Sequence, residues 1–321
     1  MNKPKKSWVK WLTLAITLGI LTVIYLQVDP REIAKHFANM RVGWFLAALC
    51  LFPCQFAVTA LRWRTMTRCV CQMSFVTSFN MTMAGKALNA LLPSKIGEMS
   101  KAWFLSRDTG ASMAQSVALA TLEKVFDLGG LSFLLLIGSA LYSKEAPAVW
   151  VGLAVAACVV GAVIVLLVFP LTWLAGIVRR IHPKLEKVAK LLESLNIIFV
   201  HWKARPFTLV AVLFLSVLLW GLHVTQIYLI FPTLNQDVPV LAGLALIPIA
   251  ILIGLLPLTV AGMGTRDSAL IYLFAPLAAG AATAGVGLFC SLRYLVDTIA
   301  GIPFFHYYNR RAQERPAPKP A

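Results

Sequence analysis

The sequence predicts an all-α polytopic membrane protein with about six transmembrane helices and two re-entrant broken hairpins. The 321 residues are 59% hydrophobic and only 13% charged, whereas a typical globular domain is roughly 45–50% apolar. Several windows without Asp, Glu, Lys or Arg approach the roughly 20 residues that one bilayer crossing needs. The windows are continuously apolar, which favours helices over the alternating strands of a membrane barrel.

Basic residues gather at the ends of the apolar windows and set the predicted orientation. They lie before the first window, after the second, in the loop 171–206 and at the end of the chain; the second cluster is Arg62, Arg64 and Arg68. Cytoplasmic loops carry an excess of Lys and Arg, so we expect these four clusters and both termini in the cytoplasm of a bacterial inner membrane. A role of these basic residues in orienting the chain during membrane insertion also accounts for the net charge of +16. No nucleic-acid partner is therefore expected.

The predicted elements follow from the apolar windows and their breaks. No small-residue cleavage site follows the first window, which is therefore an expected uncleaved anchor. The chain is expected to form one integral membrane domain over 1–321, with a cytoplasmic loop over 171–206 that holds an amphipathic helix at 181–199, and a disordered tail over 309–321. Full crossings are expected at about 8–28, 42–61, 112–141, 149–170, 207–230 and 279–305. Broken hairpins are expected at 75–107 and 240–274.

The two halves of the chain share an order of parts that predicts an inverted repeat. The first repeat covers about 42–141 and the second about 207–305. Leu91-Leu92-Pro93 aligns with Leu255-Leu256-Pro257, and the segment 122–127 aligns with 292–297. The first hairpin enters from the cytoplasm and the second from outside. Interrupted segments in matching positions of two halves indicate a transporter's substrate site near the midplane.

Five ionisable residues lie within the predicted crossings, where a central charge costs about 2.5–3.5 kcal/mol on the mildest scale. They must be paired or hydrated. Residues four apart share a helix face, so Glu123 with Asp127 and Arg293 with Asp297 can face one interior and neutralise each other across the repeat. Lys124 is the fifth. The alternative is a buried ion-pair clamp that only holds the halves together.

The hairpin breaks add backbone donors and cations. Gly262 and Gly264 permit positive φ angles, and Thr265 can cap the helix that follows. A helix start of this kind favours a phosphate, and Arg266 offers a fork for bidentate contact. Arg293 is expected to bind the phosphate together with Arg266. Further candidate residues at the site are Lys86, Asn89, Lys95, Lys101, Glu98 and Asp267, the last two to orient these cations or to receive a cationic headgroup. No catalytic residue, metal or cofactor is expected.

Three motifs resemble the membrane region of the lysylphosphatidylglycerol synthases, a flippase-like family. They are the segments 89–98, 122–127 and 262–267. The resemblance implies movement of a lipid with a polar headgroup between leaflets. The chain departs from the family at Lys101, Lys124 and Asp267, where Arg, Arg and Glu are expected, so the headgroup stays open. Bifunctional members also carry a soluble aminoacyl-transferase domain, and aminoacylation is not expected of this sequence.

The main functional hypothesis is therefore a lipid translocase and not an enzyme. Its expected partners are membrane lipids: an anionic or aminoacylated phospholipid, or a lipid linked to polyprenyl phosphate. Two alternatives are a membrane-embedded enzyme acting on a lipid-linked substrate, with Glu98, Glu123 or Asp127 as general base, and a scaffold for envelope lipid synthesis. A homodimer is compatible with the sequence. The lipid, the direction of transport, its energy source and the partner enzymes stay open.

Overall fold

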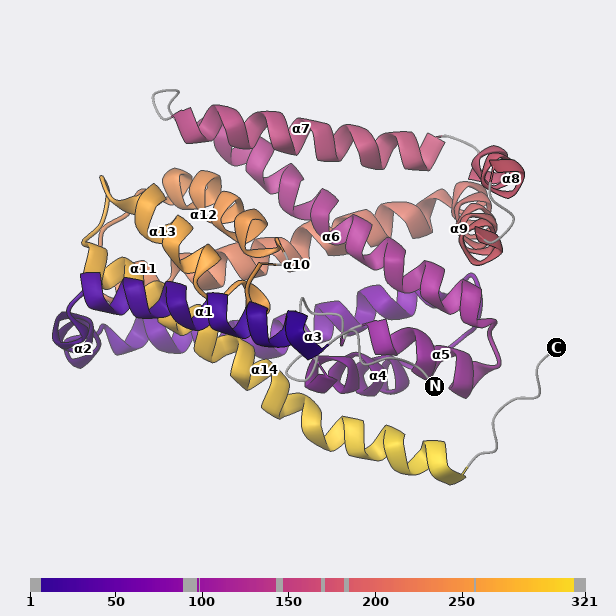
Figure 1. Cartoon of the computed structure of the whole chain (residues 1–321), viewed down its shortest axis with the longest axis horizontal. Coiled ribbons are helices and arrows are strands. Elements are labelled where there is room, and N and C mark those ends of the chain that lie inside the picture. Colours follow the sequence, from indigo (N-terminus) through magenta and orange to yellow (C-terminus); the bar gives the residue numbers. More distant parts are fainter. Residues whose placement is uncertain are drawn as a thin grey trace.

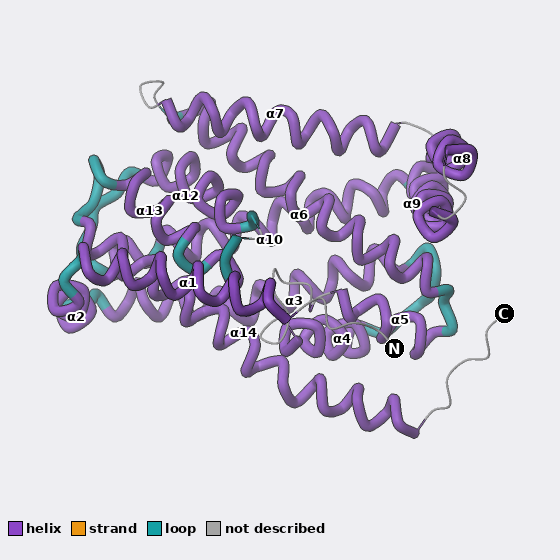
Figure 2. The backbone as a smooth tube through the Cα atoms, viewed as in Figure 1, coloured by secondary structure: helices purple, strands orange, loops and turns teal. Residues whose placement is uncertain are grey.

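The computed structural model describes residues 7–88, 97, 99–142, 147–168, 171–181, 185–256 and 258–314. Within these ranges the backbone is helical apart from turns and loops, with no strand (Figure 2). In the described part of the chain, four helices are long and apolar enough to cross a membrane: α3 (Val42–Thr67), α6 (Met113–Leu141), α10 (Pro206–Tyr228) with the short α11 (Ile230–Thr233), and α14 (Gly280–Glu314). The predicted all-helical membrane class is thus confirmed.

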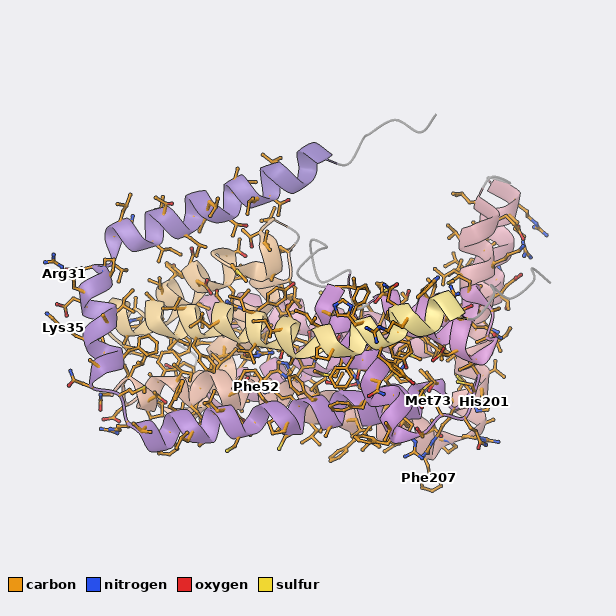
Figure 3. The ribbon with its side chains drawn as sticks, turned by 90° about the horizontal axis from the view of Figure 1, so that it is seen from below. Arg31, Lys35, Phe52, Met73, His201 and Phe207 are labelled. Atoms are coloured by element: carbon orange, nitrogen blue, oxygen red, sulfur yellow. The ribbon has the colours of Figure 1, made fainter. Side chains whose placement is uncertain are left out.

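Two further apolar helices flank this set. They are α1 (Ser7–Gln27) and α7 (Pro147–Val168), and both match predicted crossings closely. A short helix that the sequence reasoning missed, α2 (Pro30–Ala38), lies across one end of the bundle, where Figure 3 labels Arg31 and Lys35. Asp29 caps it, because its carboxylate accepts a hydrogen bond of 2.8 Å from the backbone N–H of Arg31 and satisfies a donor at the helix start.

Two pairs of short helices lie at opposite ends of the bundle (Figure 1). One pair is α4 (Phe75–Leu88) and α5 (Ser100–Thr109), and the other is α12 (Val240–Gly254) and α13 (Thr265–Phe274), which a 3₁₀ turn over Val260–Gly262 joins. Each pair occupies the position of a predicted broken hairpin. The first predicted tip, Leu91-Leu92-Pro93, and Pro257 in the second lie outside the described residues.

The predicted cytoplasmic loop contains two helices, α8 (Leu171–Ile181) and α9 (Glu186–Ala204), where one amphipathic helix over 181–199 was expected. A proline in the interval between them, Pro183, is a residue that interrupts helices. The Arg179 guanidinium joins the two helices through ion pairs of 3.1 Å to Glu186 and 2.6 Å to Glu193. Both helices lie at the end of the bundle that carries His201 and Phe207 (Figure 3).

Two helix ends differ from the sequence prediction. Helix α3 continues to Thr67, six residues past the expected end at 61, because Trp63 and Met66 are buried there and extend the packed face. Helix α14 continues to Glu314, past residue 309 where a disordered tail was expected to begin. Residues 315–321 lie outside the described part of the chain.

Glycines let several helices approach each other closely. A Cβ atom on Gly138 of α6 would lie 2.5 Å from the carbonyl oxygen of Leu244 in α12, and one on Gly301 of α14 would lie 2.4 Å from the carbonyl oxygen of Met83 in α4. Both contacts are with backbone, which cannot move aside as a flexible side chain would. Small residues at helix interfaces are a general device of membrane proteins, where dispersion contacts drive association. The close packing brings both short helix pairs against the long helices.

Candidate functional site

A cavity of about 310 Å³ opens between the two halves of the chain. Its described lining residues come from both predicted repeats, and an unusual share of them are charged for the interior of an apolar bundle. The hydroxyl-bearing side chains of Thr59, Thr82, Thr259, Tyr294 and Thr298 also line it. The charged lining residues are Arg62, Lys86, Lys101, Glu123, Lys124, Asp127, Arg266, Arg293 and Asp297.

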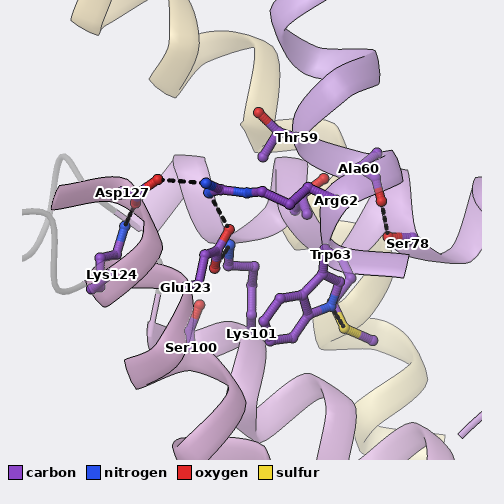
Figure 4. Close-up of polar contacts among 12 residues, drawn as sticks. Thr59, Ala60, Arg62, Trp63, Ser78, Ser100, Lys101, Glu123, Lys124 and Asp127 are labelled. Carbon is purple, nitrogen blue, oxygen red and sulfur yellow. Dashed lines mark hydrogen bonds and ion pairs between the residues drawn. The ribbon is translucent and has the colours of Figure 1, made fainter. Parts of the chain in front are cut away.

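Arg62 is the centre of the most buried charge cluster (Figure 4). It extends from α3 between two carboxylates of α6: Nη2 lies 3.1 Å from Glu123 Oε1, and Nη1 lies 2.8 Å from Asp127 Oδ1. The second oxygen of Glu123 accepts from the Lys101 ammonium of α5. Lys124 pairs with the other oxygen of Asp127 at 3.3 Å. Charges from three separate helices thus meet at one point, with both oxygens of each carboxylate engaged.

Neutral groups complete the surroundings of this cluster. Trp220 Nε1 donates to Asp127 Oδ1 at 3.3 Å, and Arg62 Nη1 donates to Ser216 Oγ at 3.2 Å. The Lys101 ammonium lies 4.9 Å from the centroid of the Trp63 ring, a cation–π contact that gains strength in a desolvated site. Only 2% of the side chains of Arg62, Lys101 and Glu123 is exposed. Such ions are tolerated only when paired and hydrogen-bonded.

The second half of the chain contributes a separate set of ion pairs. Arg266 of α13 binds Asp267 at 2.8 Å and donates to Ser291 Oγ of α14 at 3.3 Å. Lys86 of α4 binds Asp297 of α14 at 2.9 Å. The pair between Lys86 and Asp297 links the two predicted repeats at the cavity. The prediction that Glu123 and Asp127 neutralise Arg293 across the repeat is wrong, because first-half cations occupy both carboxylates.

The glycines of the second break have the positive φ angles that the sequence predicts, +76° at Gly262 and +88° at Gly264. Gly262 lines the cavity, and a Cβ there would lie 2.5 Å from the carbonyl oxygen of Gly254. Gly264 faces α1 instead, with Ile20 against its Cα. Its N–H donates to Asp267 Oδ2 at 3.0 Å, so the chain's own carboxylate caps α13. The expected cap by Thr265 and a free phosphate cradle at Gly264 are therefore wrong.

Arg293 differs from the other charged lining residues. Among the residues that the structure describes, its guanidinium has no hydrogen bond or ion pair, and its Nε is buried without a partner. One turn further along α14, Asp297 Oδ1 is also buried without a hydrogen-bond partner, while Oδ2 binds Lys86. A buried polar atom without a partner calls for an explanation, and a role in ligand binding is one.

Three predicted site residues, Asn89, Lys95 and Glu98, lie outside the described residues. The other predicted site residues line the cavity, except Gly264 and Asp267. Asp267 forms an ion pair with Arg266, which lines the cavity. Sequence reasoning missed Arg62, which it grouped with the basic cytoplasmic residues after the second crossing. A signal was available, because the buried residues Trp63 and Met66 continue the apolar pattern beyond it. Trp220 and Ser216 were also missed, since an isolated indole or hydroxyl in an apolar helix has no distinguishing pattern.

Comparison with known proteins identifies the family. The family described as "Lysylphosphatidylglycerol synthase TM region" matches residues 10–301. The chain belongs to this family. The match covers the described cavity residues, both short helix pairs and all the long helices except the start of α1 and the end of α14. It confirms the resemblance that the three sequence motifs indicate. The family assignment covers the membrane region, and it carries no statement about catalysis.

Two relatives are similar in sequence. A UPF0104 membrane protein of Methanothermobacter thermautotrophicus (strain Delta H) is 27% identical over 90% of this chain and 94% of its own length. Another UPF0104 membrane protein, of Methanocaldococcus jannaschii, is 26% identical over 58% of this chain and 78% of its own length. Both names describe membrane proteins, in agreement with the four long apolar helices of the present structure.

Proposed function

We propose that this chain is a lipid translocase, which moves a lipid with a polar headgroup between membrane leaflets without altering it chemically. The observation that carries the proposal is the charged cavity of about 310 Å³ between the two halves of an apolar helical bundle. Charged groups inside a membrane are expensive and typically mark a substrate pathway. The family, named for the membrane region of a lipid-modifying enzyme, adds support.

The proposed topology has six crossings and two re-entrant hairpins in an inverted repeat. The crossings are α1, α3, α6, α7, α10 and α14, and the hairpins are α4–α5 and α12–α13. Two features support it: the hairpins lie at opposite ends of the bundle, and the basic helices α8 and α9 lie at the end of α4 and α5 (Figure 1). This orientation puts both termini in the cytoplasm, and we propose the bacterial inner membrane as the site. Reporter fusions at either terminus test it, and an external terminus would contradict it.

In the proposed mechanism the headgroup occupies the cavity while the acyl chains stay in the bilayer. Gly254, Gly262 and Arg266 line the cavity from the second hairpin, and Lys86 and Lys101 line it from the first. The ion pair between Lys86 and Asp297, which is partly exposed to the cavity, can open and exchange partners with a headgroup at modest cost. The Arg62 cluster is more deeply buried and serves as a fixed wall.

A bulky substitution in the cavity tests the proposal. The full chain is reconstituted into liposomes that contain fluorescent phospholipids, and a membrane-impermeant quencher reports movement between leaflets. We expect protein-dependent movement that Thr59→Trp abolishes, because Thr59 lines the cavity. The matched control is Val210→Trp, at a position of α10 that is 62% exposed and faces away from the core. Absence of movement with the unmodified protein, or full activity with Thr59→Trp, would falsify the proposal.

The alternative of a membrane-embedded enzyme has less support from the geometry. A general base needs a free carboxylate oxygen, and both oxygens of Glu123 accept from cations, as do both of Asp127. Mass spectrometry of lipids incubated with the purified protein separates the two functions, since a translocase leaves their masses unchanged.

A further inference from the structure

The charges around the cavity do not balance. Among the described residues, six cationic side chains line it, while the carboxylates that line it or pair with its cations number four. In the described residues, five of the six cations have a carboxylate partner within 4.0 Å. Glu123 is shared by two of these cations, and so is Asp127. The sixth is Arg293. The segment 89–98, most of which lies outside the described residues, contains one Lys and one Glu, so its own net charge is zero.

An excess of two positive charges in an apolar bundle is unfavourable unless an anion compensates it. Water in the cavity lowers this cost but leaves the sign of the field unchanged. The cavity therefore attracts anionic groups and repels cationic ones. A headgroup that carries a net positive charge would raise the excess, whereas one with a single phosphate charge lowers it.

The geometry on α14 indicates where such an anion binds. Arg293 and Asp297 are one helical turn apart, both line the cavity, and each has a buried atom without a partner: Nε and Oδ1. The first is a hydrogen-bond donor on a cation, and the second is an acceptor. A phosphodiester next to a hydroxyl group satisfies both atoms at once. Arg266, the expected phosphate ligand from the sequence, is already bound to Asp267 and Ser291.

We propose that the cavity selects a lipid whose headgroup is a phosphodiester with net negative charge and a neighbouring hydroxyl, and that Arg293 is its phosphate ligand. The inference rests on the proposed function, because it names the substrate class of the same cavity. It excludes a headgroup with net positive charge as the preferred ligand. A glycerol phosphodiester and a sugar linked through polyprenyl phosphate share the required chemistry.

A binding experiment tests the selectivity independently of transport. Native mass spectrometry of the purified full chain in detergent measures competition among phosphatidylglycerol, phosphatidylethanolamine and lysylphosphatidylglycerol with identical acyl chains. We expect phosphatidylglycerol to bind about 10-fold or more tightly than lysylphosphatidylglycerol, as expected for one hydrogen-bonded charge. Arg293→Gln should remove this preference, and Arg293→Lys should keep part of it. Arg180→Gln, an exposed cation on α8, is the control and should bind like the unmodified protein.

The outcomes separate this inference from the proposed function. Equal binding of the three lipids, a preference for lysylphosphatidylglycerol, or an unchanged preference in Arg293→Gln would overturn the inference while leaving translocation intact. Preferential binding of phosphatidylglycerol without movement in the liposome assay would overturn translocation and leave the inference standing. A polyprenyl-phosphate sugar added as a fourth competitor distinguishes the two sources of the phosphodiester: displacement of phosphatidylglycerol assigns the site to the polyprenyl lipid.

Discussion

Replacing Glu123 by Gln should destabilise the protein by about 3–5 kcal/mol, the typical effect of breaking a buried ion pair on one side. Glu123 accepts from Arg62 at 3.1 Å and from Lys101, and only 2% of each of the three side chains is exposed. The amide has nearly the same shape, so packing is retained. Its oxygen can still accept from one cation, but its NH₂ group then faces the other. One buried cation is left without a carboxylate.

A double substitution distinguishes lost charge balance from lost packing. Lys101→Met combined with Glu123→Gln restores the net charge of the cluster and places an apolar chain on the Trp63 ring, which Lys101 now covers at 4.9 Å. We expect the double variant to recover at least half of the lost free energy of unfolding, measured by titration with SDS in mixed micelles. A change below about 1 kcal/mol in Glu123→Gln, or a double variant no more stable than the single one, would refute the reasoning.

Three further predictions concern residues away from the cavity charges. Gly138→Ala should lower the free energy of unfolding by about 1–3 kcal/mol through overpacking against the α12 backbone, whereas Gly221→Ala, with open space around its Cα, should be neutral or stabilising in the same titration. The hydrogen bond from Arg179 lowers the pKa of Glu186, so this contact is formed above the ordinary pKa of Glu and is lost as pH falls below it. Spin labels on α8 and α9 should therefore separate between pH 6 and pH 3, roughly the range that brackets that pKa, and Arg179→Gln should abolish the step. Burial raises the pKa of Cys69 from 9.0 to about 12. Maleimide should therefore label Cys69 about 1000-fold more slowly at pH 8 in the folded protein than in the unfolded protein. Peptide mass spectrometry measures the two rates, and equal rates would contradict this prediction.

The long elements of the fold were predictable because lipid imposes one requirement on every crossing. A crossing must satisfy its own backbone hydrogen bonds and expose apolar side chains. The expected crossing at 112–141 corresponds to α6 (Met113–Leu141). Ser112 caps its start, because the Gln115 N–H donates a hydrogen bond of 3.2 Å to Ser112 Oγ. The nine-residue α2 escaped prediction because it is short, polar on one face and lies outside the apolar windows.

The partners of the charged residues were less predictable than their positions. Spacing places Glu123 and Asp127 on one face of α6, and that is correct, since both contact Arg62. Spacing within one helix does not indicate which cation of another helix meets that face. Arg62 follows an apolar run and precedes Arg64, so its sequence context is that of a cytoplasmic flank. Only the packing of α3 against α10 and α6 shows that it points inward.

The cavity charges therefore divide into two groups with different expected behaviour. Arg62, Lys101 and Glu123 are held by ion pairs and almost fully buried, and of the Arg62 guanidinium only Nε lacks a hydrogen-bond partner among the described residues. Substitutions there should therefore reduce stability before they alter selectivity. Arg293 has no partner among the described residues, and its loss removes an uncompensated charge. Arg293→Gln should accordingly leave the free energy of unfolding unchanged or raise it, while it alters which lipid binds. A variant that lost stability and selectivity together would place Arg293 within the fixed wall of the cavity, and the separation between scaffold and ligand site would be wrong.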